Sequence, residues 1–113
     1  MKLLWITLFT LGALFLSAHP PSEIQLSSNL EKEEISVTVI HAVGTPTEHY
    51  VKEVRISLNG EAIITQKMQK QNSSQSVGLK YRIPGLKEGD KIEVFAECVR
   101  VGTLTQEFSI QGE

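Results

Sequence analysis

The sequence predicts an all-β domain of about seven strands arranged in two packed sheets. From residue 24 onward, short segments alternate apolar and polar residues, and this period of two is typical of half-buried strands. Gly, Pro, Asn and Asp separate these segments. None of the segments shows the sustained period of 3.6 residues that is typical of a helix. About seven such strands in about 95 residues favour an immunoglobulin-like sandwich with a modest core.

The first four strands follow from this alternation in chain order. A short strand is expected at residues 24–27, and a longer one at 34–41 places four side chains on one face: Ile35, Val37, Val39 and His41. Residues 50–58 repeat the pattern, with Val54, Ile56 and Leu58 turned inward. Asn59-Gly60 then supplies two residues that accept positive φ, so a type I′ turn should lead into a return strand at 61–68.

A polar stretch at residues 69–76 has no apolar pattern and is predicted to be a surface loop. Alternation resumes after it, and Pro84-Gly85 and Gly102 mark turns between strands. Cys98 ends the inward-facing row of the strand expected at residues 91–99. The three remaining strands are expected at 77–83, 91–99 and 103–110.

The first 18 residues are predicted to be a signal peptide. Lys2 gives a positive start, residues 3–16 are an apolar run without charge, and the small Ala18 precedes the expected cleavage site. The run is shorter than the ~20 residues that cross a bilayer as a helix, and an uncleaved N-terminal anchor is the alternative. The sequence thus predicts a signal peptide at 1–18 and one domain at 19–113. The domain is expected to be exported to the bacterial periplasm or another extracytoplasmic space, and to be free of the membrane after cleavage.

Charge and composition exclude several classes of function. Eleven basic residues against 13 acidic ones, a formal net charge of −2, leave no electrostatic footprint for nucleic acid. One cysteine can form neither an internal disulfide nor a multi-cysteine zinc site. Gly-x-Ser-x-Gly, Walker and dinucleotide-binding motifs are absent from the sequence, and no catalytic residue is assigned.

The histidines and the single cysteine are the candidate metal ligands. His41 and Cys98 close inward-facing rows at strand ends, and His49 follows His41 across a short loop, so the three are expected at one end of the sandwich. Two imidazoles and a thiolate suit iron, zinc or copper, and their ligand atoms should lie within ~5 Å of a common point. The structural alternative makes Cys98 a small core residue, His41 a core histidine bonded to backbone and His49 a surface residue.

His19 is a fourth candidate ligand. Cleavage after Ala18 would make it the first residue, with a free amine and an imidazole to offer. Pro20 has no amide hydrogen, so the next backbone nitrogen could not join a metal. With His41 and His49 this pair would form a nitrogen-rich copper site; otherwise His19 belongs to a frayed chain end.

The segments at 39–46, 48–51 and 54–56 resemble the iron domain of superoxide reductases, the desulfoferrodoxin and neelaredoxin group. Members carry two histidines around a short Pro-containing loop, the second within a Glu-His-Tyr/His-Ile/Val stretch that opens a strand. A late Gly-Asp-Lys-Ile-Glu-Val-like strand then delivers a cysteine, and residues 89–99 match it, ending near Cys98. The family fold is also an immunoglobulin-like sandwich.

The resemblance implies a ferrous iron centre that reduces superoxide to hydrogen peroxide, with an electron donor protein as partner. In the family four equatorial imidazoles and one axial thiolate hold the iron, which makes His41 and His49 equatorial and Cys98 axial here. A ligand histidine follows the family's cysteine by three positions, where this chain has Val101. The chain therefore resembles a degenerate member of the family, in which His19 would complete the site.

A second, weaker resemblance is to the small immunoglobulin-like subunit of the bacterial thiosulfate-oxidation carrier. His41, residues 46–51, the Asn59-Gly60 turn and residues 87–90 match its pattern. That subunit binds a partner chain and carries no metal. The alternative that this resemblance implies is a non-enzymatic module that binds a periplasmic protein partner.

Overall fold

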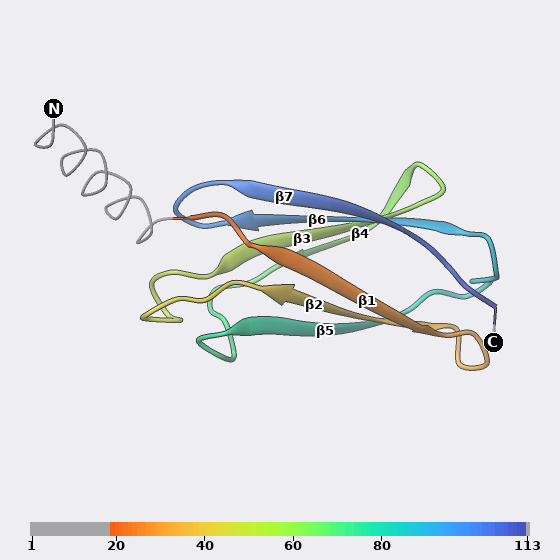
Figure 1. The fold of residues 1–113 in the computed structure, drawn as a ribbon, viewed down its shortest axis with the longest axis horizontal. Coiled ribbons are helices and arrows are strands. Elements are labelled where there is room, and N and C mark those ends of the chain that lie inside the picture. Colours follow the sequence, from red (N-terminus) through yellow and green to blue (C-terminus); the bar gives the residue numbers. More distant parts are fainter. Residues whose placement is uncertain (1–18, 113) are drawn as a thin grey trace, which may run out of the picture.

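Residues 19–112, which the computed structural model describes, form seven strands and no helix (Figure 1). The strands are β1 (Glu23–Asn29), β2 (Glu34–Ile40), β3 (Val51–Leu58), β4 (Glu61–Lys67), β5 (Ser76–Arg82), β6 (Lys91–Cys98) and β7 (Thr103–Ser109). The predicted fold class is confirmed, and the main difference is that β1 is longer than expected. The predicted signal peptide, residues 1–18, lies outside the described residues.

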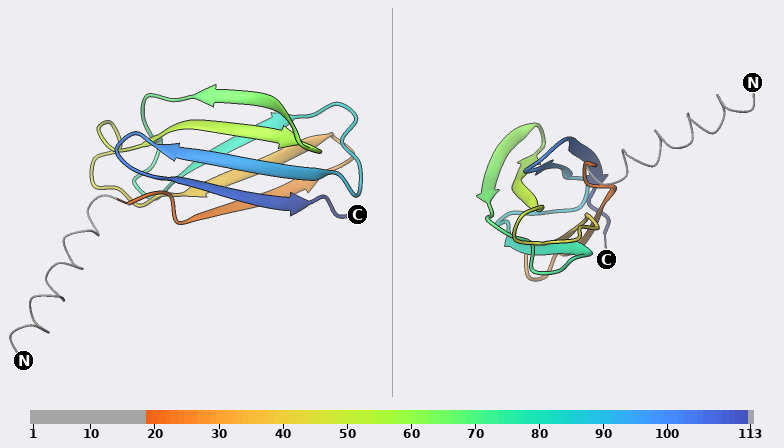
Figure 2. Two further views of the ribbon diagram at one scale, coloured as in Figure 1. Left: turned by 90° about the horizontal axis from the view of Figure 1, so that it is seen from above. Right: turned by 90° about the vertical axis from the view of Figure 1, so that its left-hand side faces the viewer.

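The strands form two antiparallel sheets that pack face to face (Figure 2). One sheet has the order β1-β2-β5 and the other the order β4-β3-β6-β7. The chain crosses between sheets after β2, after β4 and after β5, which is the connectivity of an immunoglobulin-like sandwich. Because all neighbours are antiparallel, the end of β2, the start of β3 and the end of β6 meet at the same end of the molecule (Figure 1).

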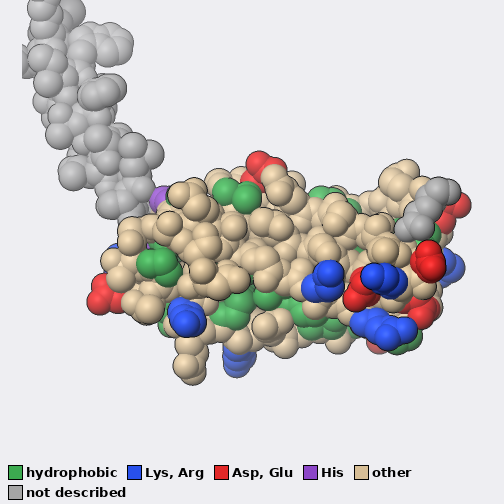
Figure 3. Space-filling model, turned by 90° about the horizontal axis from the view of Figure 1, so that it is seen from below, with side chains coloured by type: hydrophobic (Ala, Val, Ile, Leu, Met, Phe, Trp, Pro, Cys, Tyr) green, Lys and Arg blue, Asp and Glu red, His purple; other side chains and the backbone are tan. Residues whose placement is uncertain are grey.

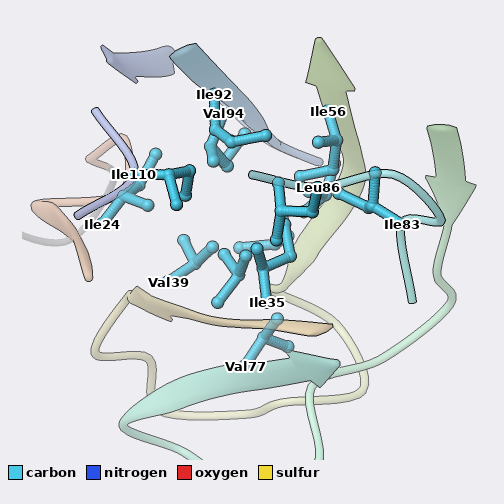
Figure 4. Close-up of a cluster of buried hydrophobic side chains, with 14 residues drawn as sticks. Ile24, Ile35, Val39, Ile56, Val77, Ile83, Leu86, Ile92, Val94 and Ile110 are labelled. Atoms are coloured by element: carbon cyan, nitrogen blue, oxygen red, sulfur yellow. The ribbon is translucent and has the colours of Figure 1, made fainter. Parts of the chain in front are cut away.

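The core lies between the two sheets and is built from the inward-facing rows that alternation predicts (Figure 4). Three residues of β2 are 0–1% exposed, namely Ile35, Val37 and Val39. The facing row of β6 is equally buried and consists of Ile92, Val94 and Ala96. Burial of the valine and isoleucine side chains stabilises the sandwich by about 1.5–3 kcal/mol for each of them.

Two local features depart from plain alternation. A β-bulge between Val51 and Glu53 resets the pleat of β3, so that Val51 and Val54 are both fully buried although they are three residues apart. The β3–β4 hairpin turns through Asn59 and Gly60, both at positive φ (49° and 90°), as a type I′ turn requires. The predicted turn is therefore confirmed.

The two ends of the sandwich differ in chemistry. On the face shown in Figure 3, histidine surface appears at one end, and acidic and basic side chains are concentrated towards the other. Residues 19–112 contain no helix that could span a membrane.

Candidate metal centre

His41, His49 and Cys98 meet at one end of the sandwich, between the two sheets. His41 directly follows β2, His49 lies two residues before β3, and Cys98 is the last residue of β6. All three are buried, at 0%, 5% and 3% exposure. One ligand atom from each lies within 4.8 Å of the other two, which meets the distance expected from the sequence. This buried group can hold a metal ion.

Backbone hydrogen bonds between two loops fix His41. The loop between β2 and β3 lies against the loop between β4 and β5, and His41 N donates to Gln75 O at 2.9 Å. Val43 N donates to Ser74 O at 2.8 Å. These two bonds extend the hydrogen-bond ladder between β2 and β5 past the end of β2. The side chain of His41 therefore points into the core, as that of Val39 does.

A tight turn places His49. Its backbone N donates to Thr45 O at 2.9 Å, and Glu48 N donates to the same oxygen at 3.0 Å. Pro46 lies inside this turn and its carbonyl accepts from Gln71 N at 3.1 Å. The short loop therefore brings His49 back beside His41, and their ring centroids are 4.8 Å apart.

The Cys98 sulfur has two polar neighbours. His49 Nε2 lies 3.2 Å from Cys98 Sγ, and the backbone N–H of Arg100 donates to the same sulfur at 3.4 Å. The tight turn that follows, in which Cys98 N donates to Gly102 O at 3.0 Å, holds Arg100 in position. Hydrogen bonds to a ligating thiolate stabilise its charge and tune the bound metal.

Gln71 determines which nitrogen of His41 faces the centre. Its Nε2 donates to two carbonyls, His41 O at 3.1 Å and Ser73 O at 3.0 Å, and this fixes the orientation of the amide. Its Oε1 accepts from Val51 N at 3.1 Å and lies 2.6 Å from His41 Nδ1. Since an amide oxygen only accepts, Nδ1 carries the proton. In the neutral ring Nε2 then carries the lone pair that a metal needs.

Sequence reasoning missed Gln71. The stretch 69–76 was predicted to be a surface loop, and for most of its residues this is correct, but Gln71 is only 3% exposed. A glutamine in a polar run gives no periodic signal. Its burial follows from the loop folding over the end of the sandwich, where Gln71 N is bonded to Pro46 O.

Electrostatics favours a neutral His49. Burial lowers the pKa of His49 below its ordinary value of 6.5, and nearby His41, Arg100 and His19 lower it further. A neutral imidazole is the form that binds metals.

His19 lies beside the three buried ligands but not among them. Its ring centroid is 5.3 Å from that of His41 and 5.9 Å from that of His49. In the structure its ring nitrogens face backbone carbonyls, Nδ1 to Pro20 O at 2.9 Å and Nε2 to Ala42 O at 3.0 Å. In the described chain, residues 19–22 contact the loop after β2 through His19 Nε2 and the end of β2 through Ser22 N, which donates to Ile40 O at 2.9 Å.

A cavity of about 460 Å³ opens next to the centre. His19 and His49 line it on one side, and the exposed Arg100 contributes the positive charge. The remaining lining residues, Ala42, Val43, Gly44 and Thr45, come from the loop after β2. A small molecule can thus approach His49 from solvent.

The donors fit a metal ion, but the group of His41, His49 and Cys98 has two imidazoles fewer than the set that the resemblance implies, and one fewer if His19 is counted. Imidazole and thiolate are ligands of iron, zinc and copper. Val101, at the position of the expected fourth histidine, is 46% exposed in the β6–β7 turn and offers no donor. The whole sequence contains three histidines.

Comparisons with known proteins gave no match, whether to a family model, to a curated protein or to a solved structure.

Proposed function

We propose that this chain is an exported iron-binding protein similar to the iron domain of superoxide reductases, and that it reduces superoxide to hydrogen peroxide. The buried group of His41, His49 and Cys98, with ligand atoms within 4.8 Å of one another, is the observation that carries the proposal. The Cys98 sulfur lies 3.2 Å from His49 Nε2 and within 4.8 Å of a ring nitrogen of His41, so it is placed to bind the same ion as both imidazoles.

The three side chains have distinct roles in holding the metal. His41 and His49 supply neutral nitrogen donors, and the Gln71 amide keeps the proton of His41 on Nδ1. The Cys98 thiolate supplies negative charge and raises the electron density on the metal. Bound ferrous iron would supply one electron, which with two protons converts superoxide to hydrogen peroxide, and an electron donor protein would restore the ferrous state.

The cavity beside His49 suits a small anion. Arg100 is at its edge, and its charge reaches the centre, since it contributes to the lowered pKa of His49. A cation at the mouth of a cavity raises the local concentration of an anionic substrate such as superoxide. Arg100 thus supplies the positive charge that would attract the anion to the cavity beside His49.

Metal analysis of the exported protein is the first test. The chain would be produced with its own N-terminal segment, purified without an affinity tag and assayed for iron, copper and zinc. We expect about one equivalent of iron. Less than about a tenth of an equivalent of any metal, unchanged on anaerobic reconstitution, would overturn the proposal and favour a non-enzymatic module that binds a protein partner. A full equivalent of copper with no iron would overturn the iron assignment.

A superoxide assay then tests the activity. Cys98→Ser should slow superoxide consumption by about 10-fold or more, because the oxygen replaces the thiolate donor. Ala96→Ser is a matched control, since Ala96 lies on the same inward row of β6 two residues earlier, is no candidate ligand, and its substitution likewise places a hydroxyl in the core. Equal rates in the wild type and Cys98→Ser would end the reductase assignment.

A further inference from the structure

The main chain at residue 19 is anchored to the centre. His19 O lies 3.2 Å from His41 Nε2, a contact without a hydrogen bond when the His41 proton is on Nδ1. Just before β1, Ser22 N donates to Ile40 O at 2.9 Å and holds the segment against the end of β2. A side chain at Gly102 would overlap Pro20, so Pro20 packs directly on the β6–β7 turn. The nitrogen of His19 lies within about 4 Å of its own carbonyl oxygen. It therefore lies within about 7 Å of His41 Nε2.

One tautomer of His19 leaves a lone pair on Nδ1 for a metal, provided that Nδ1 turns away from Pro20 O, which is 2.9 Å away. A neutral imidazole has one N–H, and both ring nitrogens of His19 face carbonyl oxygens. With the proton on Nε2, donated to Ala42 O, the lone pair lies on Nδ1. An α-amine and Nδ1 of one histidine close a six-membered chelate ring, and the bond from Nε2–H to a backbone carbonyl is the support that metal-bound histidines usually have.

We propose that proteolytic processing completes the metal centre, and that the α-amino group of His19 is one of its ligands. The inference rests on the proposed metal site. A signal peptidase would hydrolyse the Ala18–His19 bond, consuming one water and leaving a carboxylate on Ala18 and a free amine on His19. An amide nitrogen offers no lone pair to a metal, whereas an amine does on losing its proton.

The completed set has four nitrogens and one thiolate. His41 and His49 give one nitrogen each, His19 gives its amine and Nδ1, and Cys98 gives the sulfur. The amine thus takes the place left vacant by Val101, whose side chain is exposed. Pro20 has no N–H, which leaves the amine and the ring as the only donors of the first two residues. The precursor lacks this chelate, so tight metal binding begins after export.

Three forms of residues 19–113 test this inference. The first begins at His19 and is released from a fusion by a protease that cuts directly before it. The second keeps Ser17 and Ala18 in front of His19, so that the amine is displaced by two residues. The third begins at residue 19 with His19→Ala, which keeps an amine but removes the ring. Each is titrated anaerobically with Fe²⁺ against a competing chelator, after circular dichroism has shown the same fold.

We expect the form that begins at His19 to bind Fe²⁺ about 10- to 100-fold more tightly than the other two. Its ferric form should also differ from theirs in thiolate-to-iron absorption, a change that a purely structural role of the N-terminus would not produce. Equal affinity of the first two forms overturns the inference but leaves the metal site standing. Absence of Fe²⁺ binding in all three overturns the proposed function itself. An N-terminus other than His19 in the exported protein, found by mass spectrometry, also overturns the inference.

Discussion

The side-chain amide of Gln71 is buried and makes four hydrogen bonds to three residues. The amide oxygen accepts from His41 Nδ1 and from the N–H of Val51 at the start of β3, and the amide nitrogen donates to His41 O. Gln71 therefore joins both sheets at the centre. An unsatisfied buried polar group costs about 1–3 kcal/mol, so removal of this amide acts on stability as well as on the ring of His41.

Two substitutions of Gln71 separate these effects. Gln71→Leu should lower the free energy of unfolding by about 1–3 kcal/mol and weaken Fe²⁺ binding by about 10- to 100-fold, because His41 Nδ1 loses its acceptor. Gln71→Glu keeps an acceptor for Nδ1 but loses the donors, so it should destabilise the fold while keeping affinity within a few-fold of the wild type. Urea unfolding and metal titration measure the two quantities.

Gln69→Leu is the matched control, since Gln69 is an exposed glutamine of the same loop. It should change stability by less than about 0.5 kcal/mol and leave Fe²⁺ affinity unaltered. If Gln71→Leu and Gln71→Glu lose affinity equally, Gln71 does not act through the His41 proton.

The predictable and unpredictable residues of the centre differ in their sequence context. His41 and Cys98 end rows of alternating apolar residues, and their inward direction follows from the period of two. Gln71 and the main chain at residue 19 belong to no such row. Their positions depend on hydrogen bonds between loops far apart in the sequence, such as Gln71 N to Pro46 O.

At the scale of elements, the end of the sandwich opposite to the centre is held by one carboxylate. Asp90, in the loop before β6, is 3% exposed and accepts from Lys87 N at 3.0 Å, Lys87 Nζ at 2.9 Å and Asn59 Nδ2 at 3.1 Å. Asn59 in turn accepts from Lys91 N at 2.9 Å. These bonds connect the β3–β4 turn to the loop that leads into β6.

The same bonds make stability depend on acid. Hydrogen bonds from Lys87 and Asn59 lower the pKa of Asp90 from 3.8 to about 2. Since the folded-state pKa is the lower one, the carboxylate stabilises the fold fully above pH ~4, and this stability is lost as the pH falls from ~4 to ~2. Asp90→Asn should therefore lower the urea midpoint at pH 6 and approach the wild type near pH 2.

Glu88→Gln is the control for Asp90, because Glu88 is an exposed carboxylate in the same loop. Its acid profile should follow that of the wild type. A constant gap between the wild type and Asp90→Asn from pH 6 to pH 2 would contradict the assignment of this pH dependence to Asp90.

The sequence alone predicts that the seven strands exist, but it does not predict the bulge in β3. Each strand has its own alternation and each turn its own Gly, Pro or Asn, so local sequence carries the information, as the positive φ of Asn59 and Gly60 illustrates. The bulge between Val51 and Glu53 has no such marker. It arises because β3 must pair with β6 while Val51 and Val54 are both buried, and that requirement comes from the packing of two sheets.

At the scale of the whole molecule, the centre lies between the two sheets. His41 follows β2 of the three-stranded sheet, whereas His49 precedes β3 and Cys98 ends β6 of the four-stranded sheet. A metal bound by all three links the sheets at one end, and the Asp90 network acts at the other. Because the ligands converge only in the folded chain, binding energy of the metal is added to the stability of the fold.

Metal and fold should therefore be coupled. At a free Fe²⁺ concentration of about 100 Kd, the wild type gains about 2.7 kcal/mol, which for a domain of this size raises Tm by about 10–20 °C. Cys98→Ser should lose most of this increment under anaerobic calorimetry. Asp90→Asn should unfold at a lower temperature than the wild type yet keep the full increment, because distant sites act additively. An equal rise in Tm for Cys98→Ser and the wild type would mean that Fe²⁺ binds elsewhere and that the two sheets are not joined through this centre.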